Sequence, residues 1–257
     1  MPLPEHVLRY WRAADRSFRS LRQTRWGAVV TDPRYPAVWD VNYARVDVPT
    51  GDVSLAEIAG ELAPALAAAG VATFHTVSYE PDPDAGMLEE LAAAGHARSW
   101  DVVMDLAAPP EVDPIADVVE LSPGPELWAT IRETFALFGV ETDEARTQLA
   151  RIEEEVLTPA GKRWFGVRDG GRIVASAALM IFDRVGHVDN VTTFPEARGR
   201  GFATAITARI VEEAPDAGAD HLMLFADPDA PQVLRLYERL GFREVGRIAA
   251  TRGPVPG

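Results

Sequence analysis

The sequence predicts an α/β protein, built as a mixed, twisted sheet flanked by helices. Short β-branched and apolar runs alternate with stretches whose apolar residues recur every third or fourth position. One run, Val188–Thr193, passes through a glycine-containing turn into a helical pattern in which Phe202, Ile206 and Ile210 share one face. Asp169-Gly170-Gly171 separates two further β-rich runs and predicts a hairpin. The alternation and the hairpin together indicate the mixed sheet.

Composition limits the classes of protein to consider. A chain of 257 residues, 47% apolar and 25% charged, fits one large or two small globular domains. It contains no apolar run long enough to span a membrane, and Met1–His6 does not read as the start of a secretory signal. The absence of cysteine excludes disulfides, thiolate metal sites and cysteine nucleophiles, and makes a cytoplasmic location the default. A net charge of −14 argues against nucleic-acid binding and favours a cationic partner.

The first half begins with an amphipathic helical pattern and continues as alternating strands and helices. In order, we expect a helix over Glu5–Arg22, strands over Arg25–Thr31 and Val38–Val48, a helix marked by Leu55–Leu62, a strand over Val71–Tyr79, a short helix through Met87–Leu91 and a strand over Ser99–Met104. The segment Ala107–Pro114 is rich in proline, alanine and acidic residues without periodicity, which favours a linker.

The second half gives the clearer pattern. We expect a strand over Val118–Leu121, helices over Leu127–Phe138 and Glu144–Leu157, strands over Arg163–Arg168, Ile173–Phe182 and Val185–Phe194, a helix from Phe202 that Pro215 and Gly218 close, a strand over His221–Ala226, a helix from Pro231 to Leu240 and a strand over Arg243–Ile248.

The turn between the strand ending near Thr193 and the helix from Phe202 predicts an anion site. The first N–H groups of a helix have no intrahelical partner, and the helix dipole favours negative charge there. Glycines such as Gly199 and Gly201 let the backbone approach a phosphate closely. An ordinary tight turn and a dinucleotide turn are the alternatives. A dinucleotide turn follows its strand directly and has a third glycine, where this chain has Thr204.

Two motifs make the second half resemble the GNAT superfamily of acetyl-CoA-dependent N-acetyltransferases. Its pyrophosphate motif, Arg/Gln-x-x-Gly-x-Gly/Ala, matches Arg198 to Ala203, and its Leu-Tyr-x-x-x-Gly-Phe signature matches Leu236 to Phe242. The resemblance covers about residues 118 to 248 and implies the acyl-CoA N-acyltransferase fold. It also implies acetyl-CoA as cosubstrate and no metal.

The resemblance assigns roles to named residues. It implies that the pyrophosphate is held at the turn and the first helical turn, by Arg198, Gly199, Arg200, Gly201, Phe202, Ala203 and Thr204. The strand residues Val191, Thr192 and Thr193 would pair with the pantetheine arm and direct an N–H at the thioester carbonyl. Tyr237 would give a proton to the departing thiolate, although its position on an apolar stripe is equally that of a core tyrosine. Family members often have Asn where this chain has Ala230, so that side chain's contact with coenzyme A is lost or replaced.

The general base is left open among Asp189, His187 and Glu120, with Asp189 preferred because it precedes the expected thioester-binding residues. An amine acceptor must lose its proton, since a lysine-like amine with a pKa of about 10.4 is mostly charged at neutral pH.

The first half repeats the end of the second. Its order of short helix, glycine and strand around Leu91–Leu106 matches Leu236–Ile248, yet it has no glycine-rich anion turn. We therefore expect residues 1–110 to be a degenerate GNAT-like domain without a cofactor site and residues 115–257 to be the catalytic domain. The arrangement resembles mycothiol synthase-like two-domain acetyltransferases.

The expected function is acetyl transfer from acetyl-CoA to a primary amine by direct attack in a ternary complex. The acceptor would be a small molecule or a peptide, with a cationic one favoured; neither nucleic acid nor membrane is expected as a partner, and a homodimer is left open. The alternative is a non-catalytic coenzyme A-binding or regulatory module. A core position for Tyr237 and a site weakened at Ala230 would favour that alternative.

Overall fold

The computed structural model describes residues 3–82, 86–110 and 116–256. The chain divides into two compact units, Met1–Val102 with Val245–Gly257, and Val103–Glu244. Two strands, β5 (Ala97–Leu106) and β11 (Phe242–Pro254), have residues in both units. The predicted boundary near residue 110 therefore differs from the compact units. The predicted linker lies partly outside the described residues, at 111–115.

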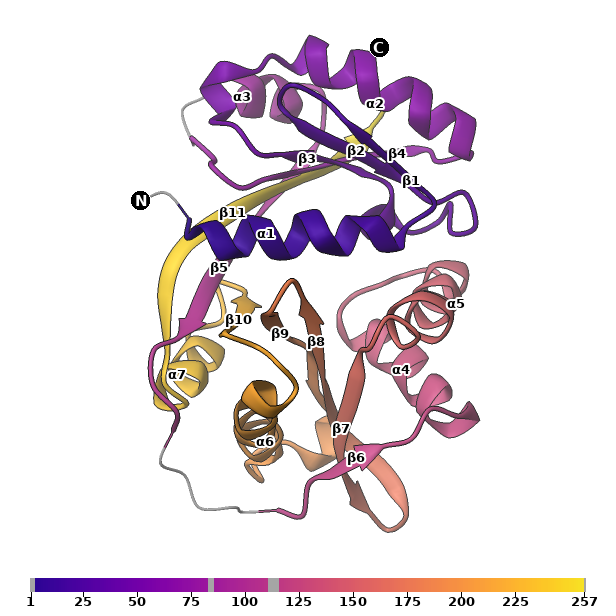
Figure 1. Ribbon diagram of the computed structural model, residues 1–257. Coiled ribbons are helices and arrows are strands. Elements are labelled where there is room, and N and C mark those ends of the chain that lie inside the picture. Colours follow the sequence, from indigo (N-terminus) through magenta and orange to yellow (C-terminus); the bar gives the residue numbers. More distant parts are fainter. Residues whose placement is uncertain (1–2, 83–85, 111–115, 257) are drawn as a thin grey trace. The chain divides into compact units, whose positions relative to one another are not determined.

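The first unit is a sheet with helices on both faces (Figure 1). Strand order is β1-β2-β3-β4-β11, and β3 and β4 form the one parallel pair among those described in it. Helices α2 and α3 lie on one side of this sheet and α1 on the other. The elements are α1 (Glu5–Ala14), β1 (Ser20–Gln23), β2 (Gly27–Thr31), β3 (Tyr43–Val46), α2 (Leu55–Ala69), β4 (Thr73–Ser78) and α3 (Gly86–Ala93), with 3-10 turns at Asp15–Ser17, Trp39–Val41 and Thr50–Asp52.

The first unit corrects the predicted first helix and last strand. The helix ends at Ala14 rather than Arg22, and residues 20–23 are strand β1. At that point Asp15 is buried, where it accepts a 2.7 Å hydrogen bond from Tyr43 and pairs with Arg45. Strand β11 runs six residues beyond the predicted end, Ile248, because Ala249 to Pro254 pair with β4. Both differences come from contacts between residues far apart in the sequence.

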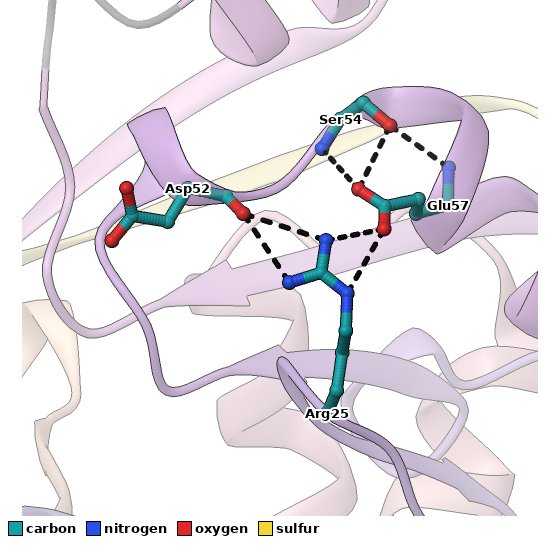
Figure 2. A network of polar contacts seen from close by, with 4 residues as sticks. All are labelled: Arg25, Asp52, Ser54 and Glu57. Atoms are coloured by element: carbon teal, nitrogen blue, oxygen red, sulfur yellow. Dashed lines mark hydrogen bonds and ion pairs between the residues drawn. The ribbon is translucent and has the colours of Figure 1, made fainter.

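The start of α2 is fixed by local polar contacts (Figure 2). Ser54 caps the helix, and the Glu57 side chain accepts from the Ser54 backbone N–H at 3.0 Å. Arg25, from the loop before β2, donates to the same carboxylate and to the Asp52 carbonyl. The hydrogen bonds from Arg25 and Ser54 lower the pKa of Glu57 to about 2. Helix α2 then packs its apolar residues Ile58, Leu62 and Leu66 on the sheet.

The second unit carries the sequence motifs. Its strand order is β5-β10-β9-β8-β7-β6, with β10 parallel to β9 and the pairs from β9 to β6 antiparallel. Figure 1 shows α6 on one side of β7–β9 and α4 and α5 on the other. The elements are β6 (Val119–Leu121), α4 (Pro125–Leu137), α5 (Asp143–Ile152), a π-helical turn (Glu153–Leu157), β7 (Arg163–Asp169), β8 (Arg172–Phe182), β9 (Val185–Thr193), a 3-10 turn (Pro195–Ala197), α6 (Phe202–Asp216), β10 (His221–Ala226) and α7 (Pro231–Arg239).

The mixed α/β sheet and the β7–β8 hairpin are confirmed. Gly170 and Gly171 both have positive φ, of 56° and 84°, which is the backbone that a tight hairpin turn requires. Across the described residues, no helix is both long enough and apolar enough to cross a bilayer.

Candidate functional site

The turn before α6 leaves the start of that helix open. Gly199 and Gly201 have φ values of 76° and 78°, a conformation that glycine adopts without strain. Gly201 is the N-cap of α6, and no side chain caps the helix. The N–H groups of Phe202, Ala203 and Thr204 precede the first intrahelical bond, which Ala205 donates to Gly201. A Cβ added at Gly199 would meet no atom within 4 Å. The N-terminus of α6 can therefore bind an anion.

Both arginines of the turn are exposed, and both contact the protein. Arg198 donates from Nε to the Thr193 carbonyl at 3.2 Å, which ties the turn to the end of β9. Arg200 pairs with Asp169 at 2.6 Å and stacks on Phe202, with its guanidinium carbon 4.6 Å from the ring centre. These contacts restrain the conformation of the turn. An exposed ion pair of this kind nevertheless adds little to the folding stability of the whole protein.

Strand β9 has a bulge at Asn190 and Val191. Ala178 lies opposite Asp189 and Ser176 opposite Thr192, so one residue of β8 faces two of β9. Asn190 takes the extra position with a φ of 53°, which asparagine tolerates better than most non-glycine residues.

The bulge lies where β9 parts from β10. The described pairing between the two strands runs from Val185 to Val188, whereas β9 continues to Thr193 and β10 to Ala226. On the side of β9 that faces β10, no strand residue that the structure describes pairs with Val191, Thr192 or Thr193. An edge of this kind presents backbone N–H and C=O groups that an extended ligand can pair with.

Tyr237 is buried in α7, as its place on the apolar stripe predicts. Its side chain is 6% exposed and meets Phe242 edge-on at 6.1 Å. Its hydroxyl makes no hydrogen bond to any described residue. Burial, together with the negative charge of Asp189, raises the pKa of Tyr237 to about 12. The phenol is therefore protonated at neutral pH and can donate a hydrogen bond.

Packing requires a glycine at position 241, after the end of α7. Gly241 has a φ of 88°, and a Cβ there would lie 1.9 Å from the Ala108 carbonyl oxygen. Its own carbonyl accepts from the Ala107 N–H at 2.9 Å. Only glycine fits this contact, which places Tyr237 relative to the chain that leaves β5.

Asp189 belongs to a buried group of charges that the sequence did not reveal. Lys162 Nζ lies 2.6 Å from Asp189 Oδ2 and 2.8 Å from Glu153 Oε2, and its side chain is fully buried. Asn190 donates from Nδ2 to Glu153 Oε1 at 3.0 Å. We call these four residues, Glu153, Lys162, Asp189 and Asn190, the lysine cluster.

The lysine cluster fixes the charge of Asp189. Burial acts to raise its pKa, but the Lys162 ammonium and the hydrogen bonds outweigh burial and lower the pKa to about 2. Burial raises the pKa of Glu153, against the opposing effect of the same ammonium. Asp189 is thus an ionised carboxylate at neutral pH and a weak base, with 34% of its side chain exposed.

The two other base candidates lie in different surroundings. His187 is buried against Phe225, with ring centres 5.3 Å apart, and burial lowers its pKa, so its imidazole is neutral at pH 7. Glu120 forms two hydrogen bonds with Arg163, at 2.8 and 2.7 Å, which lower its pKa. Its position on the edge strand β6 is separated from β9 by two other strands, so it does not join Asp189.

Ala230 begins α7 without a side-chain cap. Its methyl group supplies no polar contact, and Pro231 occupies the first helical position. Among the described residues, no three His, Asp or Glu side chains are arranged to hold a metal ion.

Several known proteins resemble this chain in sequence or in fold. A sequence model described as "Acetyltransferase (GNAT) family" matches residues 127–242. Mycothiol acetyltransferase of Actinosynnema mirum is 26% identical over 72% of this chain and 65% of its own length. That of Pseudarthrobacter chlorophenolicus is 34% identical over 36% of this chain and 30% of its own length. The chain thus spans less than two thirds of either relative.

One solved structure matches the whole chain. A GCN5-related N-acetyltransferase from Kribbella flavida superposes with a TM-score of 0.69, covering 100% of this chain and 97% of that one at 20% identity. At that identity the likeness shows a shared fold.

Proposed function

We propose that the chain transfers an acetyl group from acetyl-CoA to a primary amine, because residues 127–242 match the sequence model of the GNAT acetyltransferase family. One observation carries the proposal: the open N-terminus of α6 follows directly on the unpaired end of a bulged strand. The helix end suits a pyrophosphate, and the strand edge suits the amide groups of a pantetheine arm.

In this proposal the backbone supplies most of the binding. The N–H groups from Gly199 to Thr204 face the pyrophosphate, while Arg198 and Arg200 keep the turn in shape. The backbone of Val191–Thr193 pairs with the pantetheine arm. One N–H of this edge would stabilise the oxyanion that forms on the thioester carbonyl.

The amine nitrogen attacks the thioester carbon, and the tetrahedral intermediate then collapses. A C–N bond forms, the C–S bond breaks, the sulfur leaves with the bonding pair and the nitrogen gives up a proton. Tyr237 donates a hydrogen bond to the developing thiolate. With a pKa of about 12 against about 8.5 for a thiol, complete proton transfer from the phenol costs about 5 kcal/mol. Hydrogen bonding is therefore the larger part of its role.

Asp189 is proposed to attract the acceptor rather than to take its proton. Its carboxylate is ionised at neutral pH and is partly exposed. A protonated amine would be drawn to this negative charge before it loses a proton to solvent.

A second candidate concerns the acceptor. The matches to two mycothiol acetyltransferases favour the acceptor that those enzymes use over amines in general. Acetylation of that acceptor at a rate well above that of simple amines would support this candidate.

The proposed function is tested by calorimetry with acetyl-CoA and by thiol release in the presence of an amino sugar, a polyamine, an arylalkylamine and a lysine peptide. We expect binding and amine-dependent release of thiol. Binding without turnover on any acceptor would favour the regulatory module, and absence of binding would overturn both functions.

The pH dependence distinguishes the two roles for Asp189. Because the pKa of Asp189 is lowered to about 2, the carboxylate stays ionised above that value and is lost only as the pH falls towards it. We expect kcat/KM to rise towards high pH with the pKa of the amine. Asp189→Asn should lower kcat/KM about 10-fold at every pH, and the pH at which kcat/KM inflects should stay the same. An inflection between about pH 5 and 8 that Asp189→Asn removes would show that Asp189 is the base.

A further inference from the structure

We propose that Glu153 and Lys162 are positioning residues, which hold the Asp189–Asn190 bulge in the conformation that keeps the end of β9 open to the thioester. The inference rests on the function proposed above. It assigns to two buried residues an effect on the reaction through the backbone of β9, at a distance from the reacting atoms.

The lysine cluster joins three separate elements. Glu153 is the first residue of the π-helical turn after α5, Lys162 immediately precedes β7, and Asp189 and Asn190 lie in β9. The Lys162 ammonium reaches both carboxylates within 2.8 Å and lies 5.1 Å from the centre of the Trp164 ring. The side chain is fully buried and its ammonium is held between the carboxylates of Glu153 and Asp189, so it is a fixed point between them.

The backbone conformation of Asn190 depends on the position of the Lys162 ammonium. Its φ of 53° is uncommon for a residue with a side chain and persists only where contacts impose it. Two contacts do so here. Its backbone N–H donates to Asp189 Oδ1 at 2.8 Å, and its side-chain amide donates to Glu153 Oε1 at 3.0 Å. Each carboxylate that holds Asn190 is in turn held by Lys162.

The bulge decides which backbone groups are open. By inserting one residue against β8, it displaces the following residues, Val191 to Thr193, at the point where pairing with β10 has ended. A relaxed bulge would move these N–H groups from the positions that the thioester carbonyl and the pantetheine arm need. A displacement of these N–H groups by about 1 Å is enough to slow the reaction about 100-fold without abolishing cofactor binding.

Stability alone does not account for the cluster. Buried ion pairs cost desolvation, and apolar residues of similar volume often stabilise a protein at least as well. The other titratable groups on which the charges of the cluster act are His187 on β9 and Tyr237 on α7.

The test uses the full chain with Glu153→Gln, and Glu154→Gln as the matched control, because Glu154 is adjacent and exposed. Oε1 of Glu153 accepts from both Lys162 and Asn190, at 2.9 and 3.0 Å, and Oε2 lies 2.8 Å from the Lys162 ammonium. A glutamine therefore turns its amide NH2, a donor, towards the Lys162 ammonium in either orientation, and it removes the negative charge that holds this ammonium. We expect amide hydrogen exchange of residues 189–193 to become at least about 10-fold faster in the absence of ligand. We also expect kcat to fall at least about 10-fold, while the Kd for acetyl-CoA stays within about 3-fold. Glu154→Gln should match the wild type in hydrogen exchange, in kcat and in the Kd for acetyl-CoA.

A second pair of variants keeps the test decisive if Glu153→Gln folds poorly. Asn190→Gly and Asn190→Ala both remove the side-chain amide, but only glycine accepts the positive φ freely. We expect kcat of Asn190→Ala to be at least about 5-fold below that of Asn190→Gly.

Three results would overturn the inference. They are unchanged exchange at residues 189–193 in Glu153→Gln, equal kcat in the two Asn190 variants, and faster exchange spread evenly over the second unit, which would indicate a merely structural role. The exchange measurement needs no ligand. It therefore stands even if acetyl-CoA does not bind and the proposed function fails.

Discussion

Gly201→Glu should weaken acetyl-CoA binding at least about 100-fold. Gly201 caps α6 with a φ of 78°, so any side chain there strains the turn and projects from the helix N-terminus. Glutamate adds a negative charge where the proposal places the pyrophosphate, and the two charges would repel. A carboxylate at a helix N-terminus also stabilises the helix, which favours a folded variant.

Calorimetry on the folded variant measures this effect. Gly218→Glu is the matched control, because Gly218 also has a positive φ, of 96°, and follows the opposite end of the same helix. An added Cβ there meets no atom within 4 Å. If both variants bind acetyl-CoA as the wild type does, the pyrophosphate lies elsewhere.

Tyr237→Phe should lower kcat by about 10- to 100-fold and leave KM for acetyl-CoA nearly unchanged. The change removes only the hydroxyl, which makes no hydrogen bond to any described residue. Loss of packing should therefore be small, because the ring and its contact with Phe242 remain. The effect should fall on the step in which the thiolate leaves.

Steady-state and single-turnover kinetics separate this effect from slow product release. Tyr79→Phe is the control, since it removes the hydroxyl of a buried tyrosine from the first unit. Wild-type kcat in Tyr237→Phe, measured where chemistry limits the rate, would mean that Tyr237 serves packing alone.

Local patterns predicted most of the second unit. The β7–β8 hairpin, the glycine turn and the start of α6 each depend on residues close together in the chain, and each was found where the sequence placed it. The long-range arrangement was not predictable in the same way. Nothing within residues 249–254 indicates that they pair with β4, some 170 positions earlier. These residues were therefore predicted to belong to the second half, whereas they lie in the first compact unit.

The residues of the candidate site also differ in whether the sequence could predict them. Arg198 to Ala203 and Tyr237 were identifiable because family motifs include them, and Val191 to Thr193 and Thr204 because the resemblance to the family extends to them. The roles that the sequence assigned to all of these residues stay predictions. Glu153 and Lys162 lie in no motif, and a lysine before a strand gives no sign that it will be buried between two carboxylates. Asn190 carried a usable signal. A residue that favours turns, inside a β-branched strand, is typical of a bulge.

Hydrogen exchange of the full chain, with and without saturating acetyl-CoA, tests the central claim most directly. The proposal predicts slower exchange at the amides of residues 191–193 and 202–204, since these groups would hold the pantetheine arm and the pyrophosphate. It predicts no change in β4 of the first unit, Thr73–Ser78. Slower exchange confined to the first unit, or none at residues 202–204 in a saturated sample, would contradict the account.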